Sequence, residues 1–448
     1  MKRRIKIFAL FSLMVLFLCS CRTRAVLLFL NWGEYIDEDM IAEFEETYHC
    51  EVIMDLGDSN EIFYSKVRGG TTLYDVVVPS DYMVEKMVEN DLLAPIDFDK
   101  LANYDPEACL EGVQGILKTM EQHQAGISDY CVPYLWGTWG MMYSTLKEGL
   151  EEAVTTADNP WRALFDRSIL PTATKVAMYD SHLHAYAVAC KYLGLDSTTE
   201  LTEDSLNRIY DAVQTMDYDA WGTDSIKKDI VAQNLDLGFM WTGDFLYYYC
   251  ENVAKKVLEA YLAGDVAIAS FSEMIEVLTG DERIYTANGR TYQVGFDIYI
   301  PDDTIAFCDH FVIPKDSAHY DLALKFIDFM CGRKPVDAAF SNAYYVSYNT
   351  PFIDVYEDMV ALATTQWNED EATLFEEEVK LGTDPYDSSL FWKVYDQAIG
   401  IAFEKYYPKE EQVELPDGSI RHYKGEMLSN FNRKYVNTIN NLLNNARS

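Results

Sequence analysis

The pattern of apolar and polar positions near the start of the chain predicts strands and helices in alternation. Residues 26–30 and 51–56 have the length and apolar content of strands, and residues 75–78 include the apolar run 76–78, which is typical of a buried parallel strand. A segment with helical spacing follows each strand, and Ser59 is placed to cap the second of these helices. This alternation indicates a doubly wound α/β unit, whose ligands bind at the carboxyl ends of its strands.

A second series of strands and helices lies in the middle of the chain. Residues 175–178 and 237–240 are predicted strands, and each leads through a turn into a helix. Residues 251–300 predict a helix followed by an insertion with a hairpin around Asn288-Gly289. Two such series predict two lobes that face each other across a cleft.

The remaining segments complete both lobes. Residues 305–314 predict a strand that returns to the first lobe, and Asp316-Ser317 is expected to cap the amphipathic helix that ends at Met330. From residue 350 onward the pattern is mostly helical and strongly acidic. We therefore expect four segments to build the lobes: the first from residues 26–135 and 306–350, and the second from residues 136–305 and 351–448.

The first residues of the chain have the pattern that is typical of a targeting signal. Four cations among the first six residues precede an apolar stretch at residues 7–18, which has the size of a signal-peptide core. The tetrapeptide ending at Cys21 resembles the bacterial lipobox, so residues 1–20 are predicted to be a lipoprotein signal peptide. Cys21 would carry the lipid, and residues 21–25 would be the tether. A simple signal peptide with incidental cysteines is the alternative.

Composition narrows the class of protein. A net charge of −37 argues against nucleic-acid binding and favours solubility outside the cell. The cysteines beyond Cys21 show no CxxC or other metal-ligand spacing, so we expect small core residues rather than a disulfide framework or a metal site. These seven are Cys50, Cys109, Cys131, Cys190, Cys250, Cys308 and Cys331.

Aromatic and acidic side chains gather at the predicted strand ends. Aromatic faces attract ammonium groups and carboxylates pair with them, so a cleft of this composition suits a small amine with an apolar middle. Simpler interpretations stay open: Trp32, Trp136 and Trp241 can be core residues, and several of the polar residues can be helix caps or solvated. The candidates are Trp32, Glu34, Tyr35, Ser80, Asp81, Tyr82, Trp136, Trp139, Asp180, Trp241, Asp244, Phe307 and Asp309.

Five short segments occur in the order of a known family. They are NWGEYI at residues 31–36, YDVVVPSDY at 74–82, PYLWG at 133–137, GFMWTGD at 238–244 and CDHFVIP at 308–314. With these segments the chain resembles the spermidine/putrescine-binding proteins of bacterial ABC importers over roughly residues 26 to 350.

The resemblance implies a type II periplasmic-binding-protein fold, in which two lobes close on a ligand through a hinge. It implies a monomeric, non-enzymatic protein without cofactor or metal that delivers a polyamine to an importer permease, on the periplasmic side if an outer membrane is present. It also implies an aromatic channel formed by Trp32, Tyr35, Tyr82, Trp241 and Phe307, an amine contact at Ser80, an ion pair at Asp309 and a ligand-facing tyrosine at Tyr345.

One position departs from the family pattern. An acidic residue usually stands one turn into the helix after the strand ending at Tyr179, whereas this chain has His184 there. The bound amine can therefore differ from putrescine and spermidine, and a ligand with only one charged end becomes an option. With the ordinary histidine pKa of about 6.5, His184 predicts that affinity for a diamine rises between pH ~5.5 and ~8.

Three alternative functions have less support in the sequence. A secreted hydrolase would use two of the carboxylates as acid and base, but the sequence contains no GxSxG or HExxH motif. A metal site would draw on His182, His184, Asp309 and His310, although two histidines separated by one residue point apart on a helix. A sensor that docks a receptor is the third alternative.

Overall fold

The computed structural model describes residues 24–195, 202–409, 411–414, 418, 420–428 and 443–444. The predicted signal peptide and Cys21 lie outside these residues. In the part of the chain that is described, no helix is both long and apolar enough to cross a membrane.

The first lobe is built on a small parallel sheet, as the alternating pattern predicts. Ser59 caps the second helix by accepting a hydrogen bond from the amide of Ile62, and the left-handed Gly70 ends it. The strands, in spatial order, are β2 (Cys50–Leu56), β1 (Ala25–Asn31) and β3 (Val76–Val77), and the helices are α2 (Glu38–Tyr48), α3 (Asn60–Gly69), α4 (Asp81–Glu89), α5 (Glu111–His123) and α12 (Tyr320–Met330).

The second sheet has mixed orientation. Its spatial order is β16 (Glu426–Met427), β12 (Ile305–Phe311), β5 (Val132–Ser144), β8 (Leu237–Trp241), β6 (Val176–Tyr179) and β7 (Ala220–Gly222), with β11 (Phe296–Tyr299) also against β5. The strands β6, β7 and β8 are parallel, but β5 runs antiparallel to β8, β11 and β12. A doubly wound sheet therefore describes only part of this lobe.

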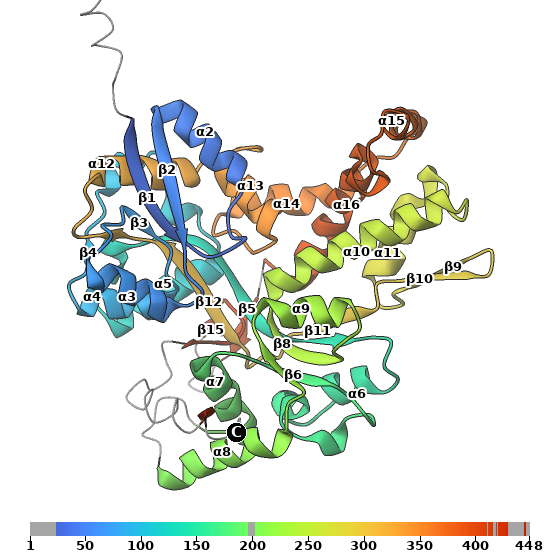
Figure 1. Cartoon of the computed structure of the whole chain (residues 1–448), viewed down its shortest axis with the longest axis horizontal. Coiled ribbons are helices and arrows are strands. Elements are labelled where there is room, and N and C mark those ends of the chain that lie inside the picture. Colours follow the sequence, from blue (N-terminus) through green and yellow to red (C-terminus); the bar gives the residue numbers. More distant parts are fainter. Residues whose placement is uncertain are drawn as a thin grey trace, which may run out of the picture.

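Two long buried strands connect the lobes. All thirteen residues of β5 and all seven of β12 are buried. β12 pairs with β5 and also meets the first lobe, through the antiparallel bridge between Ser80 and Asp309 and the bridge between Val77 and Val312. Figure 1 shows both strands running between the two groups of helices.

Helices α10 and α16 belong to a mainly helical extension, called the limb below, that projects away from the sheets (Figure 1). The predicted hairpin is present on this limb as β9 (Ile284–Ala287) and β10 (Arg290–Gln293), and Asn288 and Gly289 have the positive φ angles that its tight turn requires. The limb's helices are α10 (Thr242–Leu262), α11 (Phe271–Thr279), α14 (Ile353–Ala361), α15 (Glu369–Lys380) and α16 (Ser389–Tyr406).

The remaining elements are short or peripheral. They are α6 (Leu150–Thr155), α7 (His182–Leu193), α8 (Glu203–Met216), α9 (Asp224–Val231), α13 (Ala338–Val346), β4 (Leu93–Ala94), β13 (Ile313–Pro314), β14 (Val413–Glu414) and β15 (Ile420–Arg421).

One predicted cap is wrong. Helix α12 begins at Tyr320 with His319 as its N-cap residue, so Asp316-Ser317 does not cap it. The Ser317 hydroxyl instead donates to Asp75 Oδ1 at 2.7 Å. The His319 amide donates to Asp75 Oδ1 at 2.9 Å and to the Ser317 hydroxyl at 3.2 Å, so these side chains act on the residue that precedes the helix.

The seven cysteines listed above are all buried and unpaired. Burial raises the pKa of Cys109 to about 12, and that of Cys190 likewise to about 12. These thiols are therefore inert core groups, as their apolar surroundings in the sequence predict.

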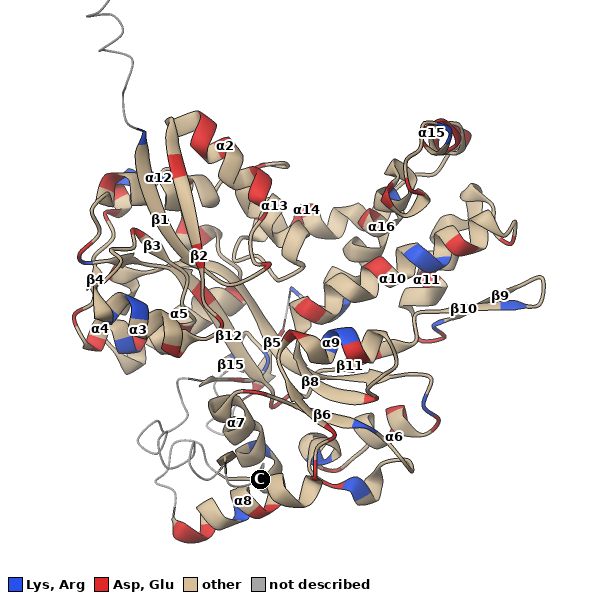
Figure 2. Ribbon diagram, viewed as in Figure 1, with Lys and Arg blue, Asp and Glu red and all other residues tan. Residues whose placement is uncertain are grey.

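Acidic side chains are spread over the whole molecule rather than gathered at one place (Figure 2). The net charge of −37 therefore does not by itself locate a ligand site.

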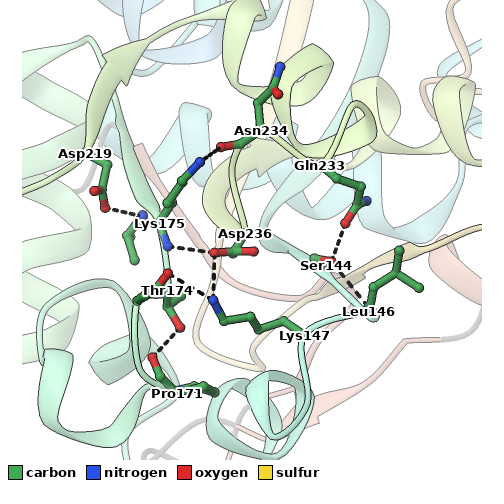
Figure 3. A network of polar contacts seen from close by, with 12 residues as sticks. Ser144, Leu146, Lys147, Pro171, Thr174, Lys175, Asp219, Gln233, Asn234 and Asp236 are labelled. Atoms are coloured by element: carbon green, nitrogen blue, oxygen red, sulfur yellow. Dashed lines mark hydrogen bonds and ion pairs between the residues drawn. The ribbon is translucent and has the colours of Figure 1, made fainter.

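A polar network fixes the starts of β6 and β8 (Figure 3). The Asp236 carboxylate accepts hydrogen bonds from the Lys175 amide at 2.8 Å and from Lys147 Nζ at 3.3 Å. The Val176 amide donates to Asp219 Oδ2 at 2.8 Å. Because this network lies at the amino ends of the strands, it sets their register without occupying the opposite ends, where ligands bind.

We expect Asp236→Ala to lower the free energy of unfolding by about 1.5–3 kcal/mol, because it removes charge-assisted hydrogen bonds. Amine affinity should stay unchanged, since the strand ends that carry Tyr179 and Trp241 lie at the other edge. Urea unfolding and calorimetry measure both quantities, with the exposed Asp211→Ala as the control. A loss of affinity at full stability would contradict this separation of roles.

Candidate ligand-binding site

Two buried carboxylates meet where α4 begins against β12. Asp309 is 5% exposed and its backbone bridges that of Ser80. Asp81 is completely buried, and its Oδ2 accepts a hydrogen bond from the Cys308 amide at 2.9 Å. Burial raises the pKa of Asp309 to about 7. Burial also raises the pKa of Asp81 to about 7, and the nearby negative charges of Glu85 and Asp309 add to this rise.

These acids have unused hydrogen-bonding capacity. The amide of Asn60 holds Ser80 from two sides, donating to its hydroxyl and accepting from its backbone nitrogen, each at 3.0 Å. The hydroxyls of Ser80 and Tyr35 lie close enough to Asp309 to oppose the rise in its pKa. Nevertheless Asp81 Oδ1, Asp309 Oδ1 and the Tyr35 hydroxyl have no hydrogen-bonding partner of normal geometry in the described part of the chain. Such buried acceptors are costly unless a donor fills them, and a bound cation would do so.

Aromatic rings continue from Asp309 toward the second lobe. The ring centre of Phe307 lies 4.8 Å from that of Trp241 and 5.9 Å from that of Tyr348, and Tyr348 is 5.2 Å from Tyr35. Trp241 stays half-buried. Rings from both lobes thus form one apolar wall beside the acidic pair, which suits the methylene chain of an amine.

The remaining predicted aromatics of the first lobe lie at the same strand ends. Trp32 is half-buried after β1, packs on Phe63 with ring centres 4.4 Å apart, and donates from Nε1 to the Val78 carbonyl at 2.8 Å. Tyr82 is buried in the first turn of α4. Trp136 and Trp139 are core residues of β5 rather than cleft residues.

His184 belongs to the second-lobe part of the aromatic cluster. Its ring stacks on Trp139 at 4.7 Å and lies 5.3 Å from Trp241, while its Nδ1 is 2.6 Å from the Ser181 hydroxyl. Enclosure by these rings lowers its pKa to about 3. His184 is therefore neutral between pH 5.5 and 8, and the expectation that it titrates in this range is wrong.

A buried ion pair occupies the first turn of α10. Asp244 is not an N-cap, because Trp241 is the cap residue; its Oδ1 instead accepts from Lys227 Nζ at 2.9 Å. Burial raises the pKa of Asp244, while Lys227 and a hydrogen bond from Tyr348 oppose the rise. Sequence reasoning did not single out Lys227, which lies seventeen positions away on α9.

Tyr345 was predicted to face the ligand, but it does not lie with the other aromatic residues of the site. It is 49% exposed on α13, whereas Tyr348, three positions on, is 6% exposed and lies between Phe307 and Tyr35. Gly243 makes room for Tyr348, since a Cβ there would lie 2.3 Å from the tyrosine ring. The sequence gives no sign that Tyr348 belongs to the site, because its contact with Gly243 is visible only in the folded structure.

The histidines considered as metal ligands are separated. His182 Nε2 lies 2.9 Å from Asn444 Oδ1, and His310 is fully buried with both ring nitrogens unpartnered. Within the residues that the structure covers, no three His, Cys, Asp or Glu side chains are grouped to hold a metal ion. The exposed Asp180 stays outside the acidic pair.

Comparison with known families gives the context for this site. The family model of bacterial extracellular solute-binding proteins matches residues 39–374. The chain belongs to this family.

Several relatives of this solute-binding protein have known ligands or structures. It is 23% identical to the putrescine-binding periplasmic protein PotF of Escherichia coli, over 72% of this chain and 78% of PotF. It is 27% identical to a putrescine/cadaverine-binding protein of Pseudomonas aeruginosa, over 75% of this chain and 85% of the relative.

Two solved structures share the architecture of this solute-binding protein. The spermidine/putrescine ABC transporter substrate-binding protein PotD of Streptococcus pneumoniae superposes with a TM-score of 0.55 at 21% identity, covering 94% of this chain and 98% of PotD. The Tp0655 (TpPotD) lipoprotein of Treponema pallidum gives 0.55 at 19% identity, covering 94% and 99%. The fold is the two-lobed type II periplasmic-binding-protein fold, as predicted.

Proposed function

We propose that this protein captures a small cationic amine outside the cytoplasm and delivers it to the permease of an ABC importer. The observation that carries the proposal is the pair of buried carboxylates, Asp81 and Asp309, each with an oxygen that has no hydrogen-bonding partner among the residues that the structure describes. Aromatic rings from both lobes stand beside them. The relatives named for putrescine, spermidine or cadaverine support the same class of ligand.

In this proposal the amine enters between the lobes. Its ammonium pairs with Asp309 and replaces the missing donor, with Ser80 and Tyr35 beside it, while Trp241 and Phe307 cover the methylene chain. Trp32 and Tyr82 line the first-lobe side, and Tyr348 takes the role expected of Tyr345. The protein binds and releases its ligand without chemical turnover.

We also propose where the hinge lies and how the protein is held at the membrane. The hinge lies in β5 and β12, so the lobe boundaries near residues 135 and 305 fall at these strands. The protein acts as a monomer, held at the membrane surface by lipid on Cys21.

A thermal-shift screen tests the proposed function. Amines, amino acids and divalent metal ions are each added to the purified protein, because a ligand that binds only the folded state raises the melting temperature. We expect ammonium compounds with an apolar middle to give the largest shifts. Shifts with metal ions alone would contradict the proposal.

Trp241→Ala is expected to weaken amine binding about tenfold while costing little stability, because the half-buried ring faces the ligand. Its cross-strand neighbour Trp139 provides the matched control. Trp139 is fully buried, so Trp139→Ala should lose about 3–5 kcal/mol of unfolding free energy. Equal losses of stability in both variants, with normal binding by folded Trp241→Ala, would place Trp241 in the core.

A further inference from the structure

The second-lobe end of the site already contains a cation. Lys227 is 5% exposed, and its ammonium lies 2.9 Å from Asp244 Oδ1 and 3.5 Å from Asp224 Oδ1. It also lies 5.9 Å from the ring centre of Tyr248. A buried lysine held in this way keeps its charge, because the two carboxylates outweigh the effect of burial on its pKa.

Lys227 is connected through Asp244 to the aromatic rings of the proposed site. The Tyr348 hydroxyl lies close enough to Asp244 to oppose the rise in the pKa of that carboxyl, and the Tyr348 ring contacts the rings of Phe307 and Tyr35, so Tyr348 lies between Asp244 at one end and Asp309 at the other. Asp244 also follows directly on the carboxyl end of β8, the strand that ends in Trp241. The site therefore has two acidic ends of different character.

The difference between the ends is one of charge. At the first-lobe end, Asp81 and Asp309 each have an oxygen without a hydrogen-bonding partner among the described residues. At the second-lobe end, the charge of Asp244 is matched by Lys227. His184, which also lies beside Trp241, carries no negative charge with which to hold an ammonium.

We propose that the ligand carries a single ammonium group, bound at Asp309, and that its other end is a hydroxyl or carboxylate rather than a second ammonium. Lys227 takes the place of that second ammonium within the protein and repels a ligand that brings one. It also leaves the second-lobe end able to receive an uncharged or anionic group. This inference rests on the proposed function and specifies its substrate class.

Three compounds with four methylene groups test the inference: putrescine, 4-aminobutanol and 5-aminopentanoate. They share one ammonium end and differ only at the other. Calorimetric titration of the wild-type protein should give at least tenfold tighter binding of 4-aminobutanol or 5-aminopentanoate than of putrescine. The member of the pair that binds more tightly shows whether the far end prefers a hydroxyl or a carboxylate.

Lys227→Met should shift the preference at least tenfold toward putrescine, because Asp244 then becomes free to accept the second ammonium. The matched control is Lys228→Met, at the exposed neighbouring lysine, which should leave the preference unchanged. In Lys227→Met/Asp244→Asn, which removes both members of the second-lobe ion pair, the gain for putrescine should disappear. If the single variant does not fold, the comparison of the three compounds in the wild-type protein still decides the inference.

The outcomes separate the two proposals. Putrescine binding as tightly as or more tightly than both other compounds in the wild-type protein overturns the single-ammonium inference and leaves amine binding intact. An unchanged preference in folded Lys227→Met overturns it as well. Failure of all three compounds to bind overturns both the inference and the proposed function.

Discussion

Asp309→Asn is expected to weaken amine binding by more than about 100-fold. The substitution keeps the shape of the side chain and removes its charge, so the bound ammonium would be buried without a counterion on its closest side. Breaking a buried ion pair by removing one partner costs about 3–5 kcal/mol, which corresponds to a factor of about 100 or more in dissociation constant. Calorimetry with a singly charged amine at pH 8 measures the effect.

The same substitution should make the ligand-free protein more stable at pH 8. Burial raises the pKa of Asp309 to about 7, above its unfolded value of about 3.9. A raised carboxyl pKa favours folding below the unfolded pKa, and this contribution is lost as the pH rises from about 4 through 7. Asparagine has no charge to bury, so its melting temperature at pH 8 should be higher than that of the wild type.

The exposed Asp316 supplies the control for both effects. Asp316→Asn should change neither affinity nor melting temperature by a measurable amount. If Asp309→Asn binds the amine normally, Asp309 is not the ammonium partner. If it loses binding together with its folded structure, the residue is structural instead.

Affinity for a singly charged amine should rise about tenfold per pH unit up to pH ~7 and then level off. The pKa values of Asp81 and Asp309 are both about 7 in the ligand-free protein. Because an ammonium binds the deprotonated acid, binding below pH 7 must release a proton, and the affinity falls as the pH falls. Calorimetry from pH 5.5 to 8 in buffers of different ionisation enthalpy measures both the affinity and the released proton.

His184→Gln distinguishes this cause from a titrating histidine. The pKa of His184, at about 3, lies below the whole range, so the variant should show the same rise in affinity as the wild type. A pH dependence that disappears in His184→Gln would show instead that the histidine titrates beside the ligand.

The order of elements and the location of the site could be predicted because local patterns determine them. Apolar runs bounded by Ser59 and by Asn288-Gly289 predicted the elements as found, and the rule that ligands bind at strand ends selected Trp241 and Asp81. Asp309 was among the same candidates although it lies inside β12, and its role as the ion-pair partner of the ligand came from the family resemblance.

Other features depend on contacts between distant segments. The antiparallel course of β5, the pairing of Lys227 with Asp244 and the approach of Tyr348 to Gly243 arise only when the lobes are assembled. The family resemblance pointed to Tyr345 rather than Tyr348, because the direction of each tyrosine depends on where α13 ends. The pKa of His184 likewise depends on the rings that enclose it, which belong to three different strands and turns.

The most direct test of the central claim is one calorimetric comparison at pH 8. Putrescine, 4-aminobutanol and 5-aminopentanoate are titrated into the wild-type protein and into Asp309→Asn. We predict saturable binding of at least one compound to a single site in the wild type, and loss of that binding in folded Asp309→Asn. No binding of any compound to the wild type, or equal affinity in both proteins, would contradict the account.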